Sequence, residues 1–413
     1  MNPLRQSRWV TALVTAAALV TTTALAACSG TSSDSTSAAV TSQPAASFTA
    51  HPATGTPISI GLINNEGGQA ISQPENRETA EAAAKYANDH LGGIGGHPIK
   101  LVICKNAEEP TSARDCANRM VEAKVSAVVV TSTGLGDILV PIITGAGIPY
   151  VSAAGQSREE LTNSLTFMWS GGFPASLDSM AADAQSKNIT TVSAFTIDVP
   201  AAVNGLRSFG AASFASRGID LNVVAIPPGT PDATPQVSAG LDNSPGAVIV
   251  VGEANLCTAA LKSLGTLGYS GVTMGIQGCA TPAVVRAVGA SINGLRVYTA
   301  ASTVGDNPEA LLYRSVVAKY SPDTDITGYA YVGYQGMLGL VRATAAINPA
   351  ETSPQAIAAA IRAAREVVLP AGDGLTFTCN GAANPTLKSV CGKGSVVATL
   401  ENGQLTDAEV HGN

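Results

Sequence analysis

Short apolar runs alternate with longer helical patterns along most of this chain, and this alternation constrains the fold more than any other feature. Residues 58–63, 99–104 and 127–131 are rich in Val and Ile and are bounded by turn residues, as buried strands are. Helical patterns at 74–91 and 111–124 separate these runs. Strands connected through helices form βαβ units, whose strands lie parallel in one sheet. The sequence therefore predicts an α/β fold.

The alternation is interrupted near Gly171 and Gly172 and then resumes. In the second series, strands are expected at 191–197, 222–226, 247–251 and 272–276, with helices at 203–217, 256–267 and 281–288. Two such series predict two lobes of similar architecture, each a parallel sheet flanked by helices.

Composition and motifs exclude several classes of function. Charged residues make up only 13% of the chain and its formal net charge is −7, whereas a nucleic-acid-binding protein needs basic patches to neutralise phosphates. The chain has no Walker A sequence, no GxSxG elbow, no HExxH and no paired CxxC. Two pairs of adjacent acids, Glu108-Glu109 and Glu159-Glu160, fall at expected helix starts or in loops, where acids favour the helix dipole and solvent. We therefore expect no enzyme activity, no cofactor, no metal and no nucleic-acid partner.

The first 27 residues have the pattern of an export signal. Arg5 and Arg8 precede an uncharged stretch whose strongly apolar centre, residues 12–20, is shorter than the ~20 residues of a membrane-spanning helix. The stretch ends in the letters LAAC, which resemble the lipobox of bacterial lipoproteins, where Cys28 would receive a lipid and become the mature N-terminus. An ordinary signal peptide cleaved nearby is the alternative. A covalent lipid would hold the protein on the outer face of the cell membrane without spanning it.

Residues 28–56 follow as a stretch of Ser, Thr, Ala and Pro with almost no large apolar side chain. Such a composition cannot bury enough apolar surface to offset the entropy lost on ordering. We expect a flexible tether here and a folded part that begins near Pro57.

Several segments resemble, in order, parts of the type I periplasmic binding proteins, the branched-chain amino acid and amide binders of ABC importers. They are NDHLGGIGGHPI at 88–99, AVVVTSTG at 127–134, GIPYVSAAG at 147–155, GTLGYSGVTMGIQG at 265–278 and GYAYVGYQGMLGLVRA at 328–343. The resemblance covers roughly residues 57–405. It implies a two-lobed Venus-flytrap with three crossovers, in which hinge closure buries a ligand at the carboxyl ends of the strands.

The same resemblance implies how the chain divides. One lobe would comprise residues 57–172 and 300–369, and the other 173–299 and 370–405. Residues 406–413 would remain as a tail.

In the first lobe, the resemblance implies ligand contacts in the loops that follow strands. Ser132 and Thr133 offer hydroxyls beside backbone N–H groups at a helix N-terminus, which suit a carboxylate or another polar acceptor. Simple N-capping is the alternative. After the next strand, family members use backbone and a hydroxyl, where this chain has Ala154 and the amide of Gln156. Ser72, in the first strand-to-helix loop, completes this set.

In the second lobe, Asp198 and Gln277 end two predicted strands. Amino acid binders of the family carry an acid at the second position, which pairs with the ligand's ammonium group, whereas Gln277 is neutral. Glu253, after a third strand, or Asp198 would supply an acid instead, unless both simply face water. The departure disfavours an amino acid and leaves amide, urea-like or carboxylate ligands open. Tyr331 would either line the cleft or pack against a helix.

The chain has seven cysteines, an odd number that Cys28 explains. The other six lie outside the reducing cytosol if the chain is exported, where pairing is expected and free buried thiols are not. Six cysteines allow many connectivities. The order of predicted strands and helices makes one the most economical, namely Cys104 with Cys116, Cys257 with Cys279, and Cys379 with Cys391.

These features together imply a monomeric, extracytoplasmic solute-binding lipoprotein of an ABC importer. It would capture a small ligand of the amino acid, amide or carboxylate class and present it to a permease that an ATPase drives. The alternative is a surface sensor lipoprotein that reports ligand occupancy to a signalling partner.

Overall fold

The computed structural model describes residues 45–68, 71–326 and 328–412. The predicted signal peptide, Cys28 and the first part of the tether lie outside these described residues. No helix within the described ranges has the length and apolar character that crossing a membrane requires.

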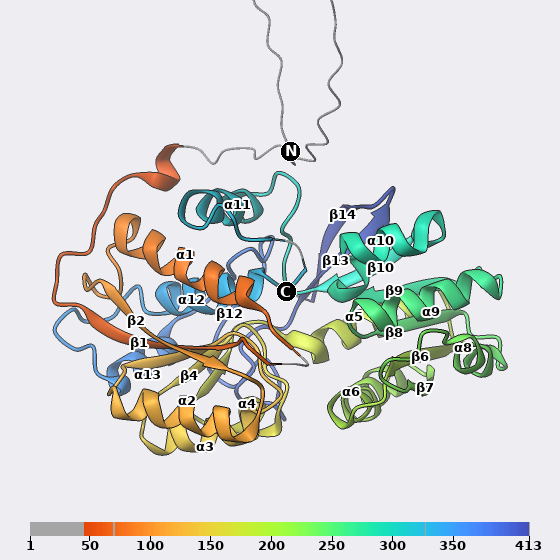
Figure 1. Ribbon diagram of the computed structural model, residues 1–413, viewed down its shortest axis with the longest axis horizontal. Coiled ribbons are helices and arrows are strands. Elements are labelled where there is room, and N and C mark those ends of the chain that lie inside the picture. Colours follow the sequence, from red (N-terminus) through yellow and green to blue (C-terminus); the bar gives the residue numbers. More distant parts are fainter. Residues whose placement is uncertain (1–44, 69–70, 327, 413) are drawn as a thin grey trace, which may run out of the picture. The chain divides into compact units, whose positions relative to one another are not determined.

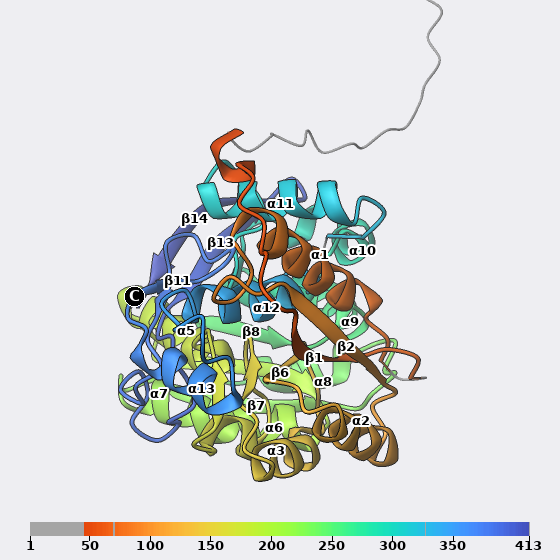
Figure 2. The same ribbon diagram turned by 90° about the vertical axis from the view of Figure 1, so that its left-hand side faces the viewer.

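The first lobe is built on a sheet of five parallel strands in the order β2-β1-β3-β4-β5. Its strands are β1 (Ile58–Asn65), β2 (Ile99–Asn106), β3 (Ala127–Val130), β4 (Tyr150–Ser152) and β5 (Thr166–Met168). Its helices are α1 (Pro74–His90), α2 (Pro110–Glu122), α3 (Gly136–Gly145), α4 (Arg158–Thr162), α11 (Pro308–Tyr320), α12 (Tyr331–Ala343) and α13 (Pro354–Ala363). Figures 1 and 2 show α1 and α12 on one face of this sheet and α2 and α3 on the other.

Alternation along the central strands explains why helices cover both faces. Successive side chains of a strand point to opposite faces. Ile60 and Leu62 of β1 belong to the core beneath α1 and α12, whereas Ile63 belongs to the core beneath α2 and α3. Because both faces are buried, the strands read as nearly continuous apolar runs, as the sequence predicts.

The second lobe is built on a sheet of seven strands in the order β14-β13-β10-β9-β8-β6-β7. The parallel strands are β6 (Thr191–Ile197), β7 (Asp220–Ile226), β8 (Ala247–Val251), β9 (Val272–Ile276) and β10 (Leu295–Thr299), and β13 (Ser395–Glu401) and β14 (Gln404–His411) add an antiparallel edge. Its helices are α5 (Gly172–Ser186), α6 (Pro200–Gly205), α7 (Ala211–Ala215), α8 (Thr234–Leu241), α9 (Ala254–Thr266) and α10 (Pro282–Val288). A π-helical turn, η2 (Leu206–Gly210), joins α6 to α7, and a 3-10 turn, η3 (Gln277–Ala280), follows β9. The predicted α/β class is confirmed in both lobes.

Three boundaries of the predicted division differ from the structure. Packing against the first lobe begins before residue 57, because Phe48 stacks on Tyr86 of α1 with ring centroids 5.6 Å apart. The segment between α13 and β13 packs in the core of the first lobe, to which Leu375 and Phe377 belong, rather than entering the second lobe at residue 370. The expected tail from residue 406 is instead part of edge strand β14, whose pairing with β13 extends to His411.

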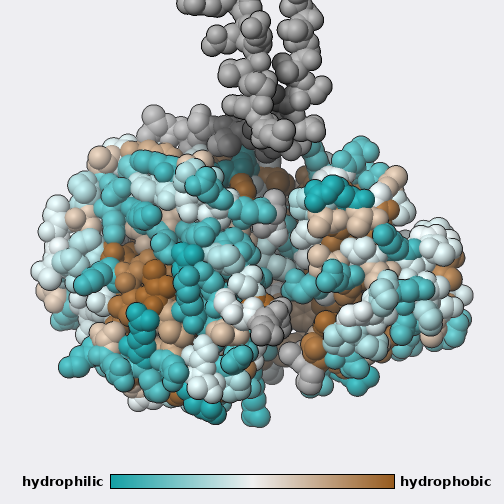
Figure 3. All heavy atoms as spheres, viewed as in Figure 1, coloured by the Kyte–Doolittle hydropathy of each residue, from teal (hydrophilic) through white to brown (hydrophobic). Residues whose placement is uncertain are grey.

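The predicted disulfide connectivity is confirmed. Cys104 pairs with Cys116, Cys257 with Cys279, and Cys379 with Cys391. Each bridge closes a short loop within a single lobe. Outside these cores, hydrophilic side chains cover most of the face shown in Figure 3.

Candidate ligand-binding site

Polar side chains gather at the carboxyl ends of β1, β2 and β3 in the first lobe. Asn65 and Asn106 are paired at the ends of β1 and β2, and the Asn106 amide donates to the Asn65 side-chain oxygen at 3.3 Å. Thr131, directly after β3, donates its hydroxyl to the side-chain oxygen of Asn64 at 2.6 Å. All four residues are buried. Polar groups this well paired fix the start of the loops that follow, at the edge where α/β sheets bind ligands.

A carboxylate that the sequence did not single out as a site residue holds the loop after β3. Glu108 accepts hydrogen bonds from the Thr133 hydroxyl at 3.1 Å, from the Asn106 side-chain amide at 3.0 Å and from the backbone N–H of Gly134. Burial raises the pKa of the Glu108 carboxyl, and the hydrogen bonds from Gly134 and Thr133 oppose that shift. The sequence predicts that Glu108 faces solvent. In the structure its carboxylate instead binds the loop that carries the predicted ligand residues Ser132 and Thr133.

A second internal carboxylate holds the loop after β4. Glu160 accepts the backbone N–H groups of Gln156 and Ser157 at 3.0 and 2.9 Å, and the Tyr150 hydroxyl at 2.6 Å. Ser157 and Glu160 form a capping box at the start of α4. The prediction that Glu160 faces solvent is wrong, because only 1% of this residue is exposed. The sequence indicates that Glu159 and Glu160 lie near the start of a helix, but it does not indicate which of the two side chains is buried.

The predicted residues of the first lobe are only partly brought together. The side-chain amide of Gln156 donates to the Ser132 hydroxyl oxygen at 3.1 Å, so these two loops meet through predicted residues. Ala154 follows β4, and its carbonyl accepts the Ser152 hydroxyl. Ser72 is exposed and accepts the backbone N–H of Gly67 at 3.1 Å, a bond within its own loop.

At the carboxyl edge of the second sheet, two buried oxygens have no hydrogen-bond partner among the described residues. They are Oε1 of Gln277, in the first residue of η3, and Oγ1 of Thr196 near the end of β6. An unsatisfied buried acceptor costs free energy unless another group supplies a donor. Thr196 was not predicted as a site residue, and inside an apolar strand it looks like an ordinary strand residue.

Two acids, Glu253 and Asp198, follow strands β8 and β6 of the same sheet. Glu253 occupies the N-cap position of α9 after β8 without accepting a capping hydrogen bond. The residue is exposed, yet desolvation by the surrounding protein raises the pKa of its carboxyl. Asp198 follows β6 and is exposed. Both lie at the ends of parallel strands, where the sequence predicts them.

Tyr329, immediately before α12, connects the two lobes. Its hydroxyl accepts the backbone N–H of Gly278 at 3.2 Å. Burial raises the pKa of the Tyr329 phenol, and the charge of Glu253 contributes to that shift. Tyr331 packs in the core of the first lobe and accepts the Thr299 hydroxyl at 3.4 Å, which favours helix packing, the second of the two roles expected for it.

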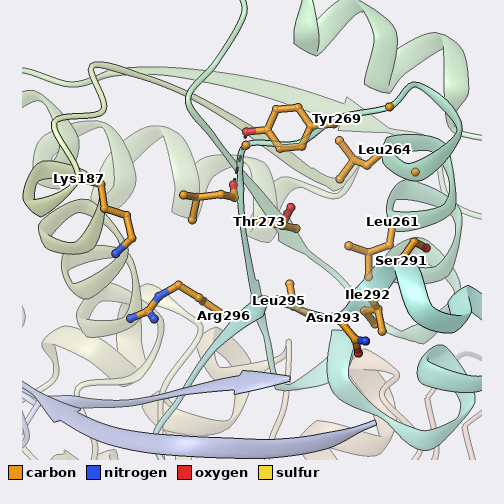
Figure 4. Close-up of a pocket in the computed structure, with 15 residues that line it drawn as sticks. Lys187, Leu261, Leu264, Tyr269, Thr273, Ser291, Ile292, Asn293, Leu295 and Arg296 are labelled. Carbon is orange, nitrogen blue, oxygen red and sulfur yellow. Dashed lines mark hydrogen bonds between the residues drawn. The ribbon is translucent and has the colours of Figure 1, made fainter. Parts of the chain in front are cut away.

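A cavity of about 530 Å³ lies elsewhere in the second lobe, by the amino ends of β9 and β10 (Figure 4). Lys187 and Arg296 line it, but both are held by Asp183, at 2.5 and 2.6 Å. Because α/β sheets bind ligands at the carboxyl ends of their strands, this cavity is not the candidate site. The described residues also contain no group of three or more His, Cys, Asp and Glu side chains placed to hold a metal ion.

Two parallel-stranded lobes with polar loops at the carboxyl ends of their strands define a bilobal solute-binding protein. The family model described as periplasmic binding protein matches residues 57–390, and the chain belongs to this family, of type I. The predicted resemblance is thereby confirmed. Members of the family bind solutes outside the cytoplasm and are not enzymes.

Solved structures of similar fold include three binding proteins, two of which are named as parts of transporters. A leucine-binding protein from Thermotoga maritima has a TM-score of 0.68 at 20% identity, over 86% of this chain and 98% of that one. The branched-chain amino acid transporter substrate-binding protein of Streptococcus pneumoniae, in complex with isoleucine, has a TM-score of 0.68 at 20% identity, over 87% and 100%. A fatty acid ABC transporter substrate-binding protein from Thermomonospora curvata has a TM-score of 0.70 at 13% identity, over 88% and 94%. A comparison with curated proteins finds no match.

Proposed function

We propose that this protein is the solute-binding component of an ABC importer and that it captures a small polar ligand between its two lobes. The observation that carries the proposal is the buried oxygen of Gln277, which has no hydrogen-bond partner in the described part of the chain and lies one residue before the Gly278 N–H that Tyr329 of the other lobe binds. An unsatisfied acceptor at a lobe-to-lobe contact is what a protein that closes on a ligand would retain. The similar structures that are named as transporter components support the same role.

The ligand-binding set in this proposal combines both lobes. It comprises Ser132, Thr133, Ala154 and Gln156 from the first lobe and Asp198, Glu253 and Gln277 from the second, with Ser72 and Tyr331 at the periphery. Ser132 and Gln156 already form one bonded pair, so a ligand would meet them as a unit. Mechanistically the protein performs no chemistry: binding stabilises closure because the ligand contacts more groups in the closed state.

We also propose that a lipid on Cys28 anchors the protein, as a monomer, to the outer face of the cell membrane, where it meets a permease that an ATPase drives. The support is the LAAC motif after an export signal. Metabolic labelling with a radioactive fatty acid tests it: the wild-type chain should carry label and partition into detergent, and C28A should do neither. Unlabelled wild-type protein would contradict the anchor.

A thermal-shift screen over amino acids, amides, aromatic acids and sugars tests the proposed function. At least one class should raise the melting temperature, and the shift should be lost in S132A and Q277A. S216A is the matched control, because Ser216 is exposed and bonds only within its own helix turn. If binding survives in both site variants, the site assignment fails; if no compound stabilises the protein, the proposed function fails.

A further inference from the structure

Four donors at the carboxyl edge of the first sheet are already bonded to the protein's own carboxylates. Glu108 takes the Thr133 hydroxyl and the Gly134 N–H. Glu160 takes the N–H groups of Gln156 and Ser157. Each of the two predicted ligand loops of this lobe therefore has two donors that an internal carboxylate already occupies.

The carboxylates of Glu108 and Glu160 are each held by further interactions within the protein. Glu160 is buried, bonded to Tyr150 and locked in the capping box of α4. Glu108 is held with a φ of 59°, in the left-handed region that non-glycine residues seldom adopt. Its backbone N–H also bonds the Asn106 side-chain oxygen at 3.1 Å, so the conformation is fixed at both ends.

A ligand carboxylate that approached Thr133 and Gly134 would meet the charge of Glu108. To reach the Gly134 N–H, it must displace Glu108 and leave the displaced carboxylate partly desolvated nearby. Like charges a few ångströms apart in a partly desolvated site repel strongly. The first lobe is therefore built against anionic ligands at this point.

The second lobe has the complementary requirement. The Gln277 oxygen and the Thr196 hydroxyl oxygen are buried without partners among the described residues, and the Glu253 carboxylate lies after the neighbouring strand β8. The Gln277 oxygen and the Glu253 carboxylate are acceptors, and N–H groups of a ligand would satisfy them. A negatively charged ligand would again approach an acid.

We infer that the ligand is recognised as a hydrogen-bond donor, through a primary amide or an amine, and that Glu108 is the specificity residue that excludes recognition through a carboxylate. The inference rests on the proposed function, because it assigns the ligand class of the same site. The sequence leaves amide, urea-like and carboxylate ligands open, and the structure removes the carboxylates from this set. Glu108 acquires a role in specificity that no sequence motif indicated.

Matched pairs of compounds that differ only at the carboxyl group test this inference. Leucine and leucinamide, isobutyrate and isobutyramide, and benzoate and benzamide are titrated into wild type, E108A and E108Q, with binding followed by thermal shift and calorimetry. In the wild type, the amide member of at least one pair should bind at least ~10-fold more tightly than its acid, a difference of about 1.4 kcal/mol. In E108A the acid should gain affinity by a similar factor, because the Thr133 and Gly134 donors become free.

The controls separate a specific effect from a general one. E109A removes the adjacent exposed acid and should leave the amide-to-acid ratio unchanged. E108Q keeps an acceptor for Gly134 and is the informative variant if E108A fails to fold, since it should relax the exclusion through loss of charge alone.

The outcomes are distinguishable. A wild-type protein that binds an acid as tightly as its amide would overturn the inference and leave the proposed function standing. An amide preference that persists in both folded Glu108 variants would overturn the role of Glu108. Absence of binding by every compound in both this set and the broader screen would overturn the proposed function and the inference with it.

Discussion

The Tyr329 phenol oxygen and the Gly278 backbone nitrogen lie 3.2 Å apart in a hydrogen bond that joins the two lobes. Gly278 sits against Gly252, where an added Cβ would lie 2.6 Å from the Gly252 carbonyl oxygen. The Tyr329 hydroxyl thus positions η3 and, with it, the neighbouring Gln277. A residue of the first lobe orients the proposed ligand-binding residue of the second.

Y329F should weaken ligand binding without unfolding either lobe. The variant keeps the aromatic ring but leaves the Gly278 N–H without its partner, which costs about 1–3 kcal/mol. We expect affinity for whichever compound the screen identifies to fall at least ~5-fold by calorimetry. Y320F is the control, because the Tyr320 hydroxyl donates to Asp89 at 2.8 Å within the first lobe and outside the proposed site. Equal affinities for Y329F and Y320F would contradict this role.

The α1–α12 contact requires glycine at position 333. A Cβ there would lie 1.7 Å from the Asn76 carbonyl oxygen, an overlap with backbone that no rotamer change can relieve. G333A should therefore lower the free energy of unfolding by about 3 kcal/mol or more. G145A is the matched control: an added Cβ in α3 meets nothing within 4 Å and should stabilise the protein by up to about 1 kcal/mol. Urea denaturation that ranks both variants alike would refute the argument.

Sequence patterns predicted what depends on local chemistry. The buried strands followed from apolar runs, as in β8, where Val248 and Val250 enter one core and Ile249 the other. The disulfides followed from the order of strands and helices, because each bridge lies within one local unit. The family resemblance added the two-lobed arrangement.

What sequence patterns missed depends on tertiary packing. Glu108 and Glu160 look like solvent-facing acids, and only the loops that fold back over them make them internal partners. The segment around Phe377 has no strand or helix periodicity, so its place against Trp169, with ring centroids 5.0 Å apart, could not be assigned. The lack of a hydrogen-bond donor near the Gln277 side-chain oxygen, among the described residues, likewise depends on the positions of all surrounding side chains.

The Cys257–Cys279 disulfide should contribute substantially to the stability of the second lobe. It joins α9 to η3 and closes a loop with a sequence separation of 22 residues. Loop-closure entropy for such a length corresponds to about 3 kcal/mol. The double variant C257S/C279S should lose roughly that much in urea denaturation followed by circular dichroism. The fully reduced wild type, which has lost all three bridges, should be less stable than the oxidised variant, which keeps two. A variant whose free energy of unfolding equals that of the oxidised wild type would contradict the estimate.

Replacing Glu253 with glutamine should stabilise the protein at neutral pH. Desolvation raises the pKa of Glu253 above its usual 4.5, so the native state holds the proton more tightly than the unfolded chain does. Wild-type stability from this group is therefore highest at low pH and declines as the pH rises through the folded-state pKa. E253Q should melt higher than the wild type at pH 7 and alike below pH ~4.

Glu66 provides the control of opposite sign. Desolvation alone would raise the pKa of Glu66, but the hydrogen bonds and charges of Arg77 and Lys105, at 2.8 and 2.7 Å, lower it. E66Q should therefore melt lower than the wild type at pH 7, with the difference shrinking in acid. If both substitutions shifted the melting temperature in the same direction at pH 7, the assignment of these two environments would be wrong.

Asp183 holds α5 against β10 and should be the most acid-sensitive group of the second lobe. Its carboxylate, 5% exposed, binds Lys187 at 2.5 Å and Arg296 at 2.6 Å and accepts the Tyr298 hydroxyl at 2.7 Å. Desolvation acts to raise its pKa, but the Lys187 and Tyr298 hydrogen bonds and the Arg296 charge lower it below the usual value. The stabilisation is thus complete above the unfolded-state pKa and is lost as the pH falls through the lower, folded-state pKa.

D183N should therefore lower the free energy of unfolding at pH 7 by about 2–3 kcal/mol, less than the ~3–5 kcal/mol of a fully buried pair because Lys187 and Arg296 keep some solvent contact. The loss relative to wild type should shrink when urea denaturation is repeated below the usual Asp pKa of about 3.9, because there the unfolded chain binds a proton at Asp183 that the native state still excludes. D178N, on the same helix, is the control: Asp178 is 55% exposed and its pair with Arg217 should contribute about 1 kcal/mol or less. Equal destabilisation by D183N and D178N at pH 7 would show that Asp183 does not act as the buried anchor between α5 and β10.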